Sequence, residues 1–184
     1  MAGIETIRKE IKRLADPEKA KILQRFFKTG AGEYGEGDVF IGVRVPACRR
    51  VVRVNRGLPL ADCLALLESE IHEERLVALL LMVQLYADSP TARDGVYDAY
   101  LANTGWINNW DLVDASSRDI VGIHLLDRPR APLYALAASE DLWERRIAIV
   151  STYAFIREGD LDDTFTISEV LLGDAHDLMH KACG

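Results

Sequence analysis

Two seven-residue stretches, ERLVALL at residues 74–80 and ERRIAIV at residues 144–150, match at an offset of 70 positions. That offset equals two units of about 35 residues, a spacing typical of stacked helix pairs such as HEAT repeats. The match therefore favours a helical solenoid over a compact bundle. Solenoids of this kind curve, and their concave face usually binds an extended partner.

Two neighbouring arginines behave differently within this repeat. Arg145 occupies the position of Arg75, whereas Arg146 stands where the first stretch has Leu76. A side chain that recurs with the repeat is typical of a structural role. Arg146 breaks the repeat, which indicates a function of its own.

The rest of the chain also shows helical periodicity, and no window shows sustained two-residue alternation bounded by hairpin turns. A glycine-containing segment from Thr29 to Val45 is expected to be a loop. The sequence predicts an all-α fold, a superhelical solenoid of HEAT-like antiparallel helix pairs in a single domain over residues 1–184. The expected helices are one ending near Asp16-Pro17, one from Pro17 through Phe27, and then 46–56, 60–69, 72–87, 90–103, 107–122, 130–139, 141–157, 162–173 and one beginning near His176.

The first two helices have apolar residues at three- and four-residue steps, and these are the expected core faces. The members are Ile4, Ile7, Ile11 and Leu14 in the first helix, and Ile22, Leu23, Phe26 and Phe27 in the second.

The formal net charge of −7 is unevenly distributed. Residues 1–57 hold 13 Lys and Arg against 7 Asp and Glu, whereas the remaining residues hold 9 against 22. This asymmetry predicts an electropositive N-terminal surface on an acidic body. The alternative is that the basic residues are only the solvated faces of two helices. They are Arg8, Lys9, Lys12, Arg13, Lys19, Lys21, Arg25 and Lys28.

Several functional classes find no support in the sequence. The three cysteines are widely spaced without a C-x-x-C, so they are expected to be reduced core residues. His176 and His180 have a spacing that can hold a metal, but no third ligand is evident. Neither a P-loop nor a Gly-x-Ser-x-Gly elbow is present. We expect no metal, no cofactor and no membrane span, and a cytoplasmic monomer.

Trp110 and Asp114 form the most distinctive pair. They are four residues apart and therefore share one face of a helix, where Arg146 can reach them from a neighbouring helix. A flat ring, an anion and a forked cation together suit a negatively charged polymer that carries a cationic lesion.

Three longer blocks carry a family resemblance: GEYGEGDVFIGVRVP at residues 32–46, NWDLVD at 109–114 and LWERRIAIVST at 142–152. In this order they resemble the DNA alkylation repair (AlkD-like) family of HEAT-repeat DNA glycosylases. The resemblance implies a concave face that holds duplex DNA. It also implies base excision repair by removal of bases alkylated at ring nitrogens, such as 3-methyladenine or 7-methylguanine.

The resemblance assigns Trp110, Asp114 and Arg146 to lesion contact and catalysis. A base alkylated at N3 or N7 is cationic and leaves as a neutral molecule without a general acid. A carboxylate such as Asp114 would then stabilise the oxocarbenium-like sugar and orient water. Trp110 would lie against the sugar or base, and Arg146 would grip a flanking phosphate. Expected DNA contacts are Arg44, Tyr34, Phe40 and Arg145.

Each of these residues also has a structural interpretation. Trp110 is alternatively a core aromatic, and Asp114 is alternatively the partner of Arg118 one turn later. Arg145 and Arg146 are alternatively partners of Glu140, Asp141 or Glu144. Tyr34, Phe40 and Arg44 are alternatively packing residues of the long loop.

Two features depart from the family pattern. The sequence ends at Gly184, where members of the family continue with a tryptophan-containing helix pair, and the total charge is acidic. Two other functions therefore stay open. One is a non-catalytic relative that binds unusual DNA structures, and the other is a HEAT-like scaffold for protein interactions, which needs only the solenoid.

Overall fold

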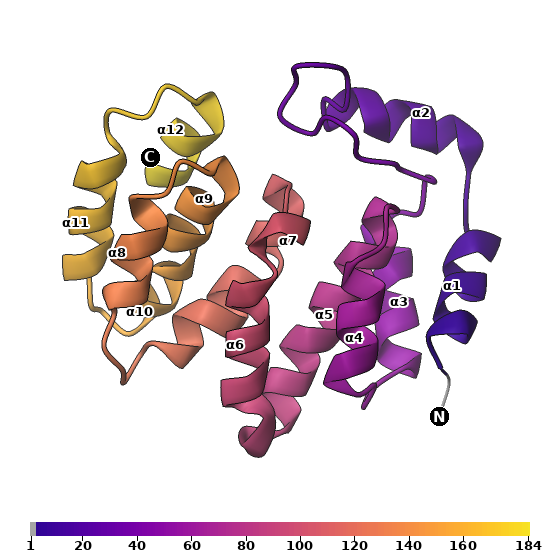
Figure 1. Ribbon diagram of the computed structural model, residues 1–184, viewed down its shortest axis with the longest axis horizontal. Coiled ribbons are helices and arrows are strands. Elements are labelled where there is room, and N and C mark those ends of the chain that lie inside the picture. The colour runs from indigo at the N-terminus through magenta and orange to yellow at the C-terminus, as the bar shows by residue number, and fades with distance from the viewer. Residues whose placement is uncertain (1–2) are drawn as a thin grey trace. The chain divides into compact units, whose positions relative to one another are not determined.

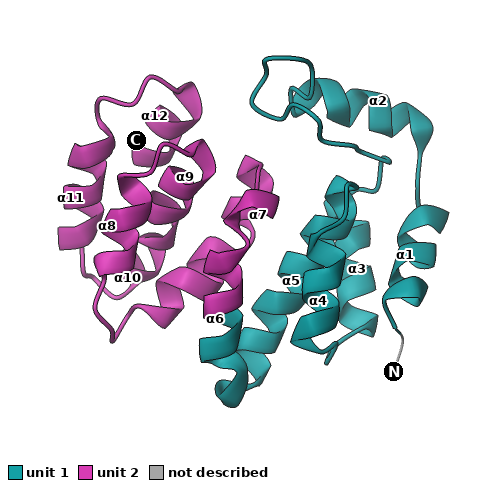
Figure 2. Ribbon diagram, viewed as in Figure 1, with its two compact units in different colours: residues 1–96 teal, residues 97–184 magenta. Residues whose placement is uncertain are grey.

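The computed structural model describes residues 3–184, and every regular element in this part of the chain is a helix (Figure 1). An isolated parallel bridge joins Val39 to Ile71, and residues 3–184 contain no strand. The predicted all-α class is confirmed. The chain divides into two compact units, Met1–Val96 and Tyr97–Gly184 (Figure 2). The solenoid and the single domain stay predictions.

Unit 1 has its core between α1, α3, α4 and α5, where Ile7, Ile11, Leu66 and Leu79 are fully buried. Helices α4 and α5 form a closely packed pair. The elements of unit 1 are α1 (Ile4–Arg13), α2 (Pro17–Phe26), α3 (Val45–Val54), α4 (Leu60–Leu67), α5 (His72–Asp88), a 3₁₀ turn (Pro90–Ala92) and the start of α6 (Arg93–Ala102).

Helix α2 begins where the sequence predicts, but its predicted core face is wrong in part. Asp16 caps the helix by accepting the backbone N–H groups of Glu18 and Lys19, at 3.1 and 3.2 Å. Ile22 and Phe26 are 56% and 61% exposed. Phe27 is buried as predicted, and Ala20 is buried because the first turn of α2 lies against the backbone of the loop at Gly42.

The loop between α2 and α3 is held by a buried carboxylate. Glu73 of α5 is 2% exposed and accepts backbone N–H groups from three consecutive residues of the loop. The donors are Ile41 (3.1 Å), Gly42 (2.8 Å) and Val43 (3.0 Å). A neighbouring buried carboxylate, Asp38, bonds His72 at 2.9 Å and also Arg75. The irregular backbone is therefore satisfied by the first turn of α5.

Unit 2 contains a second closely packed helix pair, α8 and α9, at the positions the sequence repeat predicts. Its elements are the rest of α6, a 3₁₀ turn (Thr104–Trp106), α7 (Trp110–Asp114), a π-helical turn (Arg118–Gly122), α8 (Ala131–Ala137), α9 (Leu142–Ser151), α10 (Tyr153–Arg157), α11 (Asp162–Leu171) and α12 (Asp177–Cys183).

Two helices that the sequence predicts as continuous are interrupted. The segment 107–122 starts as a helix only at Trp110 and is broken before the π-helical turn, and the segment 141–157 divides at Thr152. The hydroxyl of Thr152 donates to the carbonyl of Ile149 at 2.7 Å, a bond that bends helices. The π-helical turn packs closely on this bend, because a Cβ on Gly122 would lie 2.3 Å from the carbonyl oxygen of Ser151.

We expect Gly122→Ala to lower the free energy of unfolding by about 1–3 kcal/mol, because the added methyl group has no room between the two segments. Gly95→Ala in α6 is the matched control, since its Cβ would meet only a side-chain atom of Leu60 at 3.9 Å. The control should be neutral or slightly stabilising. Urea unfolding compares the two, and equal stability of both variants would contradict the close approach.

The cysteines behave as small apolar residues. Cys48 and Cys63 are fully buried, and Cys183 is half-buried. Burial raises the pKa of the Cys63 thiol to about 12, which leaves it unreactive at neutral pH. Separately, no helix within residues 3–184 has the length and apolar composition needed to cross a membrane.

Candidate functional site

Helix α7 positions Trp110 and Asp114 at its two ends. Asn109 is fully buried, and its side chain accepts the backbone N–H of Trp110 at 2.9 Å, which starts the helix. Leu112 and Val113 are fully buried and anchor it. The predicted pair therefore lies on one short, well-fixed helix. Trp110 is half-buried and Asp114 is exposed.

Arg146 of α9 holds Asp114 in a two-pronged ion pair. Nε donates to Oδ1 at 2.9 Å and Nη2 donates to Oδ2 at 2.8 Å. The third donor, Nη1, reaches the carbonyl of Leu178 at 2.7 Å. The side chain of Arg146 is only 9% exposed, whereas that of Asp114 is 38% exposed. The carboxylate is thus fixed on one side by a buried cation and open to solvent on the other.

This geometry favours a positioning role for Arg146. Three of its five guanidinium donors bond Asp114 and Leu178, and its contact with a phosphate stays a prediction. The arrangement suits a residue that positions the carboxylate of Asp114. The alternative partner of Asp114, Arg118, is instead paired with Asp119 through two bonds of 2.8 Å.

Asp114 and Arg146 line a cavity of about 520 Å³ within unit 2. Arg118, Thr152 and Tyr153 also line it; the sequence named Arg118 only as an alternative partner of Asp114 and did not single out Thr152 or Tyr153. Tyr153 is 50% exposed, and the guanidinium carbon of Arg118 lies 5.8 Å from its ring centre. Thr152 and Tyr153 reach this place through the bend in the helix, and no periodic pattern signals that bend.

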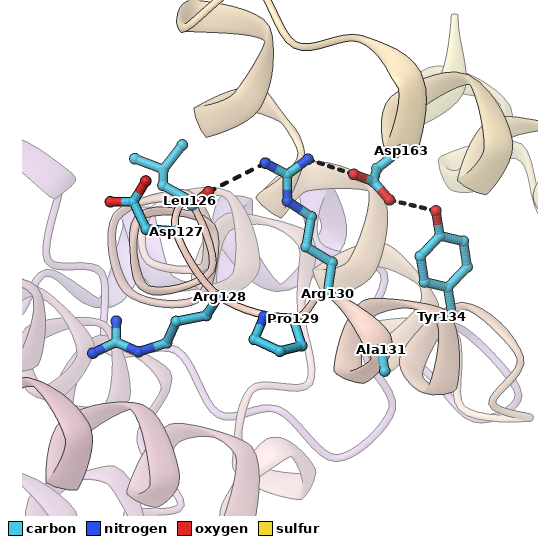
Figure 3. Close-up of a pocket in the computed structure, with 8 residues that line it drawn as sticks. All are labelled: Leu126, Asp127, Arg128, Pro129, Arg130, Ala131, Tyr134 and Asp163. Carbon is cyan, nitrogen blue, oxygen red and sulfur yellow. Dashed lines mark hydrogen bonds and ion pairs between the residues drawn. The ribbon is translucent and has the colours of Figure 1, made fainter.

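A second cavity of unit 2, of about 670 Å³, is lined by Arg130, Tyr134 and Asp163 (Figure 3). Here the polar groups satisfy one another. Arg130 bonds Asp160 at 2.7 Å and also Asp163, and Tyr134 donates to Asp163. Burial opposes ionisation of Asp163, but the bonds from Tyr134 and Arg130 outweigh it and hold the carboxyl pKa below its ordinary value. We interpret this network as a structural link between α8 and α11.

Arg145 has the structural role that the sequence repeat indicates. Its Nη1 donates to the carbonyls of Ser139 and Glu140, at 3.0 and 2.8 Å, in the turn between α8 and α9. Arg75 makes the same two bonds, to Ser69 and Glu70, between α4 and α5. The offset of 70 therefore holds for individual hydrogen bonds.

Both arginines also pair with a carboxylate, because Arg145 bonds Asp174 at 2.6 Å and Arg75 bonds Asp38. The guanidinium of Arg145 is thus engaged on several sides. Its predicted contact with DNA stays a prediction, and its geometry gives that prediction no support.

The remaining predicted DNA contacts lie in unit 1. Phe40 is 5% exposed and packs in one cluster with Phe27 and His72, whose ring centres lie 4.7 and 4.1 Å from its own, as the packing alternative predicts; its contact with DNA stays a prediction. Tyr34 is half-buried, and its hydroxyl donates to the carbonyl of Phe26 at the end of α2 at 3.4 Å. Arg44 is exposed at the N-terminus of α3. Contacts of Tyr34 and Arg44 with DNA stay predictions.

His176 caps helix α12, and His180 contacts the backbone of the preceding loop. Nδ1 of His176 accepts the backbone N–H of Leu178 at 3.2 Å, and Nε2 of His180 lies 2.6 Å from the carbonyl oxygen of Asp174. Residues 3–184 contain no group of three or more His, Cys, Asp or Glu that could hold a metal ion.

The family described as DNA alkylation repair enzyme matches residues 7–184, which is nearly the whole chain. No protein of curated function matches it.

Proposed function

The chain belongs to the DNA alkylation repair enzyme family, and from this premise we propose that it is a DNA glycosylase for cationic purines. Its substrates would be bases alkylated at N3 or N7, such as 3-methyladenine and 7-methylguanine, in duplex DNA. The family supports a role in DNA repair. The specific reaction is proposed from the geometry of unit 2.

The observation that carries the proposal is the way in which the carboxylate of Asp114 is bonded and exposed. One side of its carboxylate is fixed by the two bonds from Arg146, and the other side faces solvent at the wall of the 520 Å³ cavity. A carboxylate that is both preorganised and accessible suits the stabilisation of a developing cation. An ordinary surface carboxylate would be mobile, and a buried one could not reach a substrate.

The reaction requires no general acid to protonate the departing base. Alkylation at N3 or N7 places a positive charge on the purine, so the glycosidic bond breaks with its electron pair leaving on the base, which becomes neutral. Positive charge then develops on the sugar. Asp114 stabilises this charge and orients or deprotonates the water that adds to the sugar.

Trp110 and Arg146 support this carboxylate. Trp110 stands one helical turn before Asp114, where the face of its ring can attract the same cation. Arg146 is a positioning residue, because its planar fork matches both carboxylate oxygens.

The proposal is tested by incubating the protein with a duplex that carries 7-methylguanine at low ionic strength. We expect free 7-methylguanine and an abasic site in the product. Binding of this duplex without release of the base would refute the glycosylase and favour a relative that only binds DNA. Failure to bind DNA would instead favour a protein-interaction scaffold.

We expect Arg146→Lys to slow base release by roughly 10- to 100-fold without weakening DNA binding, because a lysine cannot make both bonds to Asp114. Arg145→Lys is the control, since it changes the adjacent structural arginine. It should lower the melting temperature while leaving the rate of release unchanged at temperatures well below melting. Equal rates for the two variants would remove the positioning role of Arg146.

A further inference from the structure

Helix α3 lies in a stretch of unusual charge. Residues 39–61 contain arginines at positions 44, 49, 50, 53 and 56 and no aspartate or glutamate, although the whole chain has a net charge of −7. A run of cations without compensating anions repels itself, and like charges one helical turn apart destabilise a helix by about 0.2–0.5 kcal/mol per pair. The sequence therefore concentrates positive charge where local stability does not require it.

The structure places these cations on one exposed side of the helix. Ala47, Cys48, Val51 and Val52 are the buried residues of α3. Arg49, Arg50 and Arg53 are exposed, and Arg56 follows in the next turn of the chain. Together the four arginines line a groove of about 640 Å³, whose other side is formed by residues of α5 such as Leu80, Val83 and Gln84. We call these four residues the arginine row.

The arginine row has no carboxylate partners, unlike several other arginines of the chain. Arg13 and Arg118 each lie 2.7 Å from a neighbouring carboxylate. Within residues 3–184, no carboxylate oxygen lies within 4.0 Å of any guanidinium of the row. Asp88 lines the same groove but is not paired with the row. The guanidinium groups of Arg49, Arg50 and Arg53 are thus available to an external anion.

The spacing of the row suits a strand of nucleic acid. Arg49 and Arg53 are one helical turn apart, about 6 Å along the axis, and the row continues to Arg56. Phosphates recur about every 3.4 Å along the axis of each strand, so the row can contact two or three in succession. Arg56 faces the amide of Gln84, whose oxygen, with the amide turned toward the guanidinium, accepts Nε and Nη2 at 2.6 and 2.7 Å.

We infer that the arginine row binds successive backbone phosphates of duplex DNA. The inference rests on the proposed function, which supplies duplex DNA as the substrate. Such contacts bind without reading base sequence and position the protein on the duplex. They also explain how an acidic protein acquires affinity for a polyanion, since the positive charge is concentrated on one side of one helix.

The test compares two double variants with the same change in net charge. Arg49→Gln with Arg53→Gln removes half of the arginine row. Arg13→Gln with Lys21→Gln is the control, because both side chains are 68% exposed and paired with carboxylates. Binding of an undamaged duplex is measured by fluorescence anisotropy from about 50 to about 200 mM KCl. Melting temperatures verify that both variants are folded.

We expect the row variant to bind about tenfold more weakly at roughly 0.1 M salt. The slope of log K against log salt should become shallower by about 1.8, or about 0.9 for each lost phosphate contact. The control should keep the wild-type slope. Equal losses of duplex affinity in both variants, or no loss in either, would overturn the inference. So would a row variant that loses affinity for anionic lipid vesicles but not for the duplex.

Base release separates this inference from the proposed function. At limiting protein, the row variant should release 7-methylguanine more slowly than the wild type, because it binds the duplex more weakly, whereas the Arg13→Gln, Lys21→Gln control should match the wild type. Should the wild type release no base while the row variant still loses affinity for the duplex, the glycosylase proposal fails and the phosphate contacts stand. If the row variant and the control bind the duplex alike while the wild type releases base, the phosphate contacts fail and the glycosylase proposal stands.

Discussion

Replacing Asp114 with asparagine is expected to slow the release of 7-methylguanine by about 10²- to 10⁴-fold under single-turnover conditions. Asparagine preserves the size of the side chain but removes the negative charge that stabilises the sugar cation. It also replaces one acceptor of the Arg146 fork with an amide that cannot accept. Binding of undamaged duplex should change by only a few-fold, because the loss concerns the transition state.

Asp160→Asn is the matched control for this experiment. Asp160 is also in unit 2, is also paired with an arginine, and has a side-chain exposure of 40% against 38% for Asp114. The control should release base at the wild-type rate. Equal slowing by both substitutions would show that a general loss of negative charge, and not the position of Asp114, is responsible.

Replacing Glu73 with alanine is expected to lower the free energy of unfolding by about 3 kcal/mol or more. The change leaves three neighbouring backbone N–H groups, those of residues 41–43, without their acceptor in a buried place. For a chain of this length, the melting temperature should fall by roughly 10 °C. Chemical and thermal unfolding both measure the effect.

Glu36→Ala provides the comparison. Glu36 also accepts a backbone N–H, that of Gly32 at 2.8 Å, but it does so at the surface, where water can replace it. Its substitution should change stability by less than about 1 kcal/mol. If Glu73→Ala were as mild as Glu36→Ala, the buried carboxylate would not be what holds the loop between α2 and α3.

Local periodicity predicts the helices well but not their interruptions. The positions of α4, α5, α8 and α9 follow from apolar spacing and breaker residues, which act within a few positions of the chain. The bend at Thr152 depends on a hydroxyl that bonds the carbonyl of Ile149. Threonine occurs in many straight helices, so its presence alone could not predict the bend.

The core face of α2 shows a second limit. Ile22 and Phe26 match a helical stripe, yet both are exposed, because the helix packs instead on the loop backbone at Gly42. Which stripe is buried depends on a partner that is distant in sequence. A hydrophobic pattern alone does not specify that partner.

The sequence places Trp110, Asp114 and Arg146 in one candidate site, but it does not specify the bonds between their side chains. The spacing of Trp110 and Asp114 and the break in the repeat at Arg146 single out these residues from the sequence. That Arg146 bonds Asp114, 32 positions away, requires the packing of α9 against α7. The same packing supports the proposal that Arg146 positions the carboxylate, while its contact with a phosphate stays a prediction.

The dependence of base release on the charge of the lesion tests the central claim most directly. The claim is that one fixed carboxylate suffices because the departing base is already cationic. We therefore predict release of 7-methylguanine and 3-methyladenine from duplex DNA, and no release of a neutral base such as uracil from the same sequence context. Release of neutral and cationic bases at similar rates would contradict the claim, since it would require a general acid, and so would the absence of release from either cationic lesion.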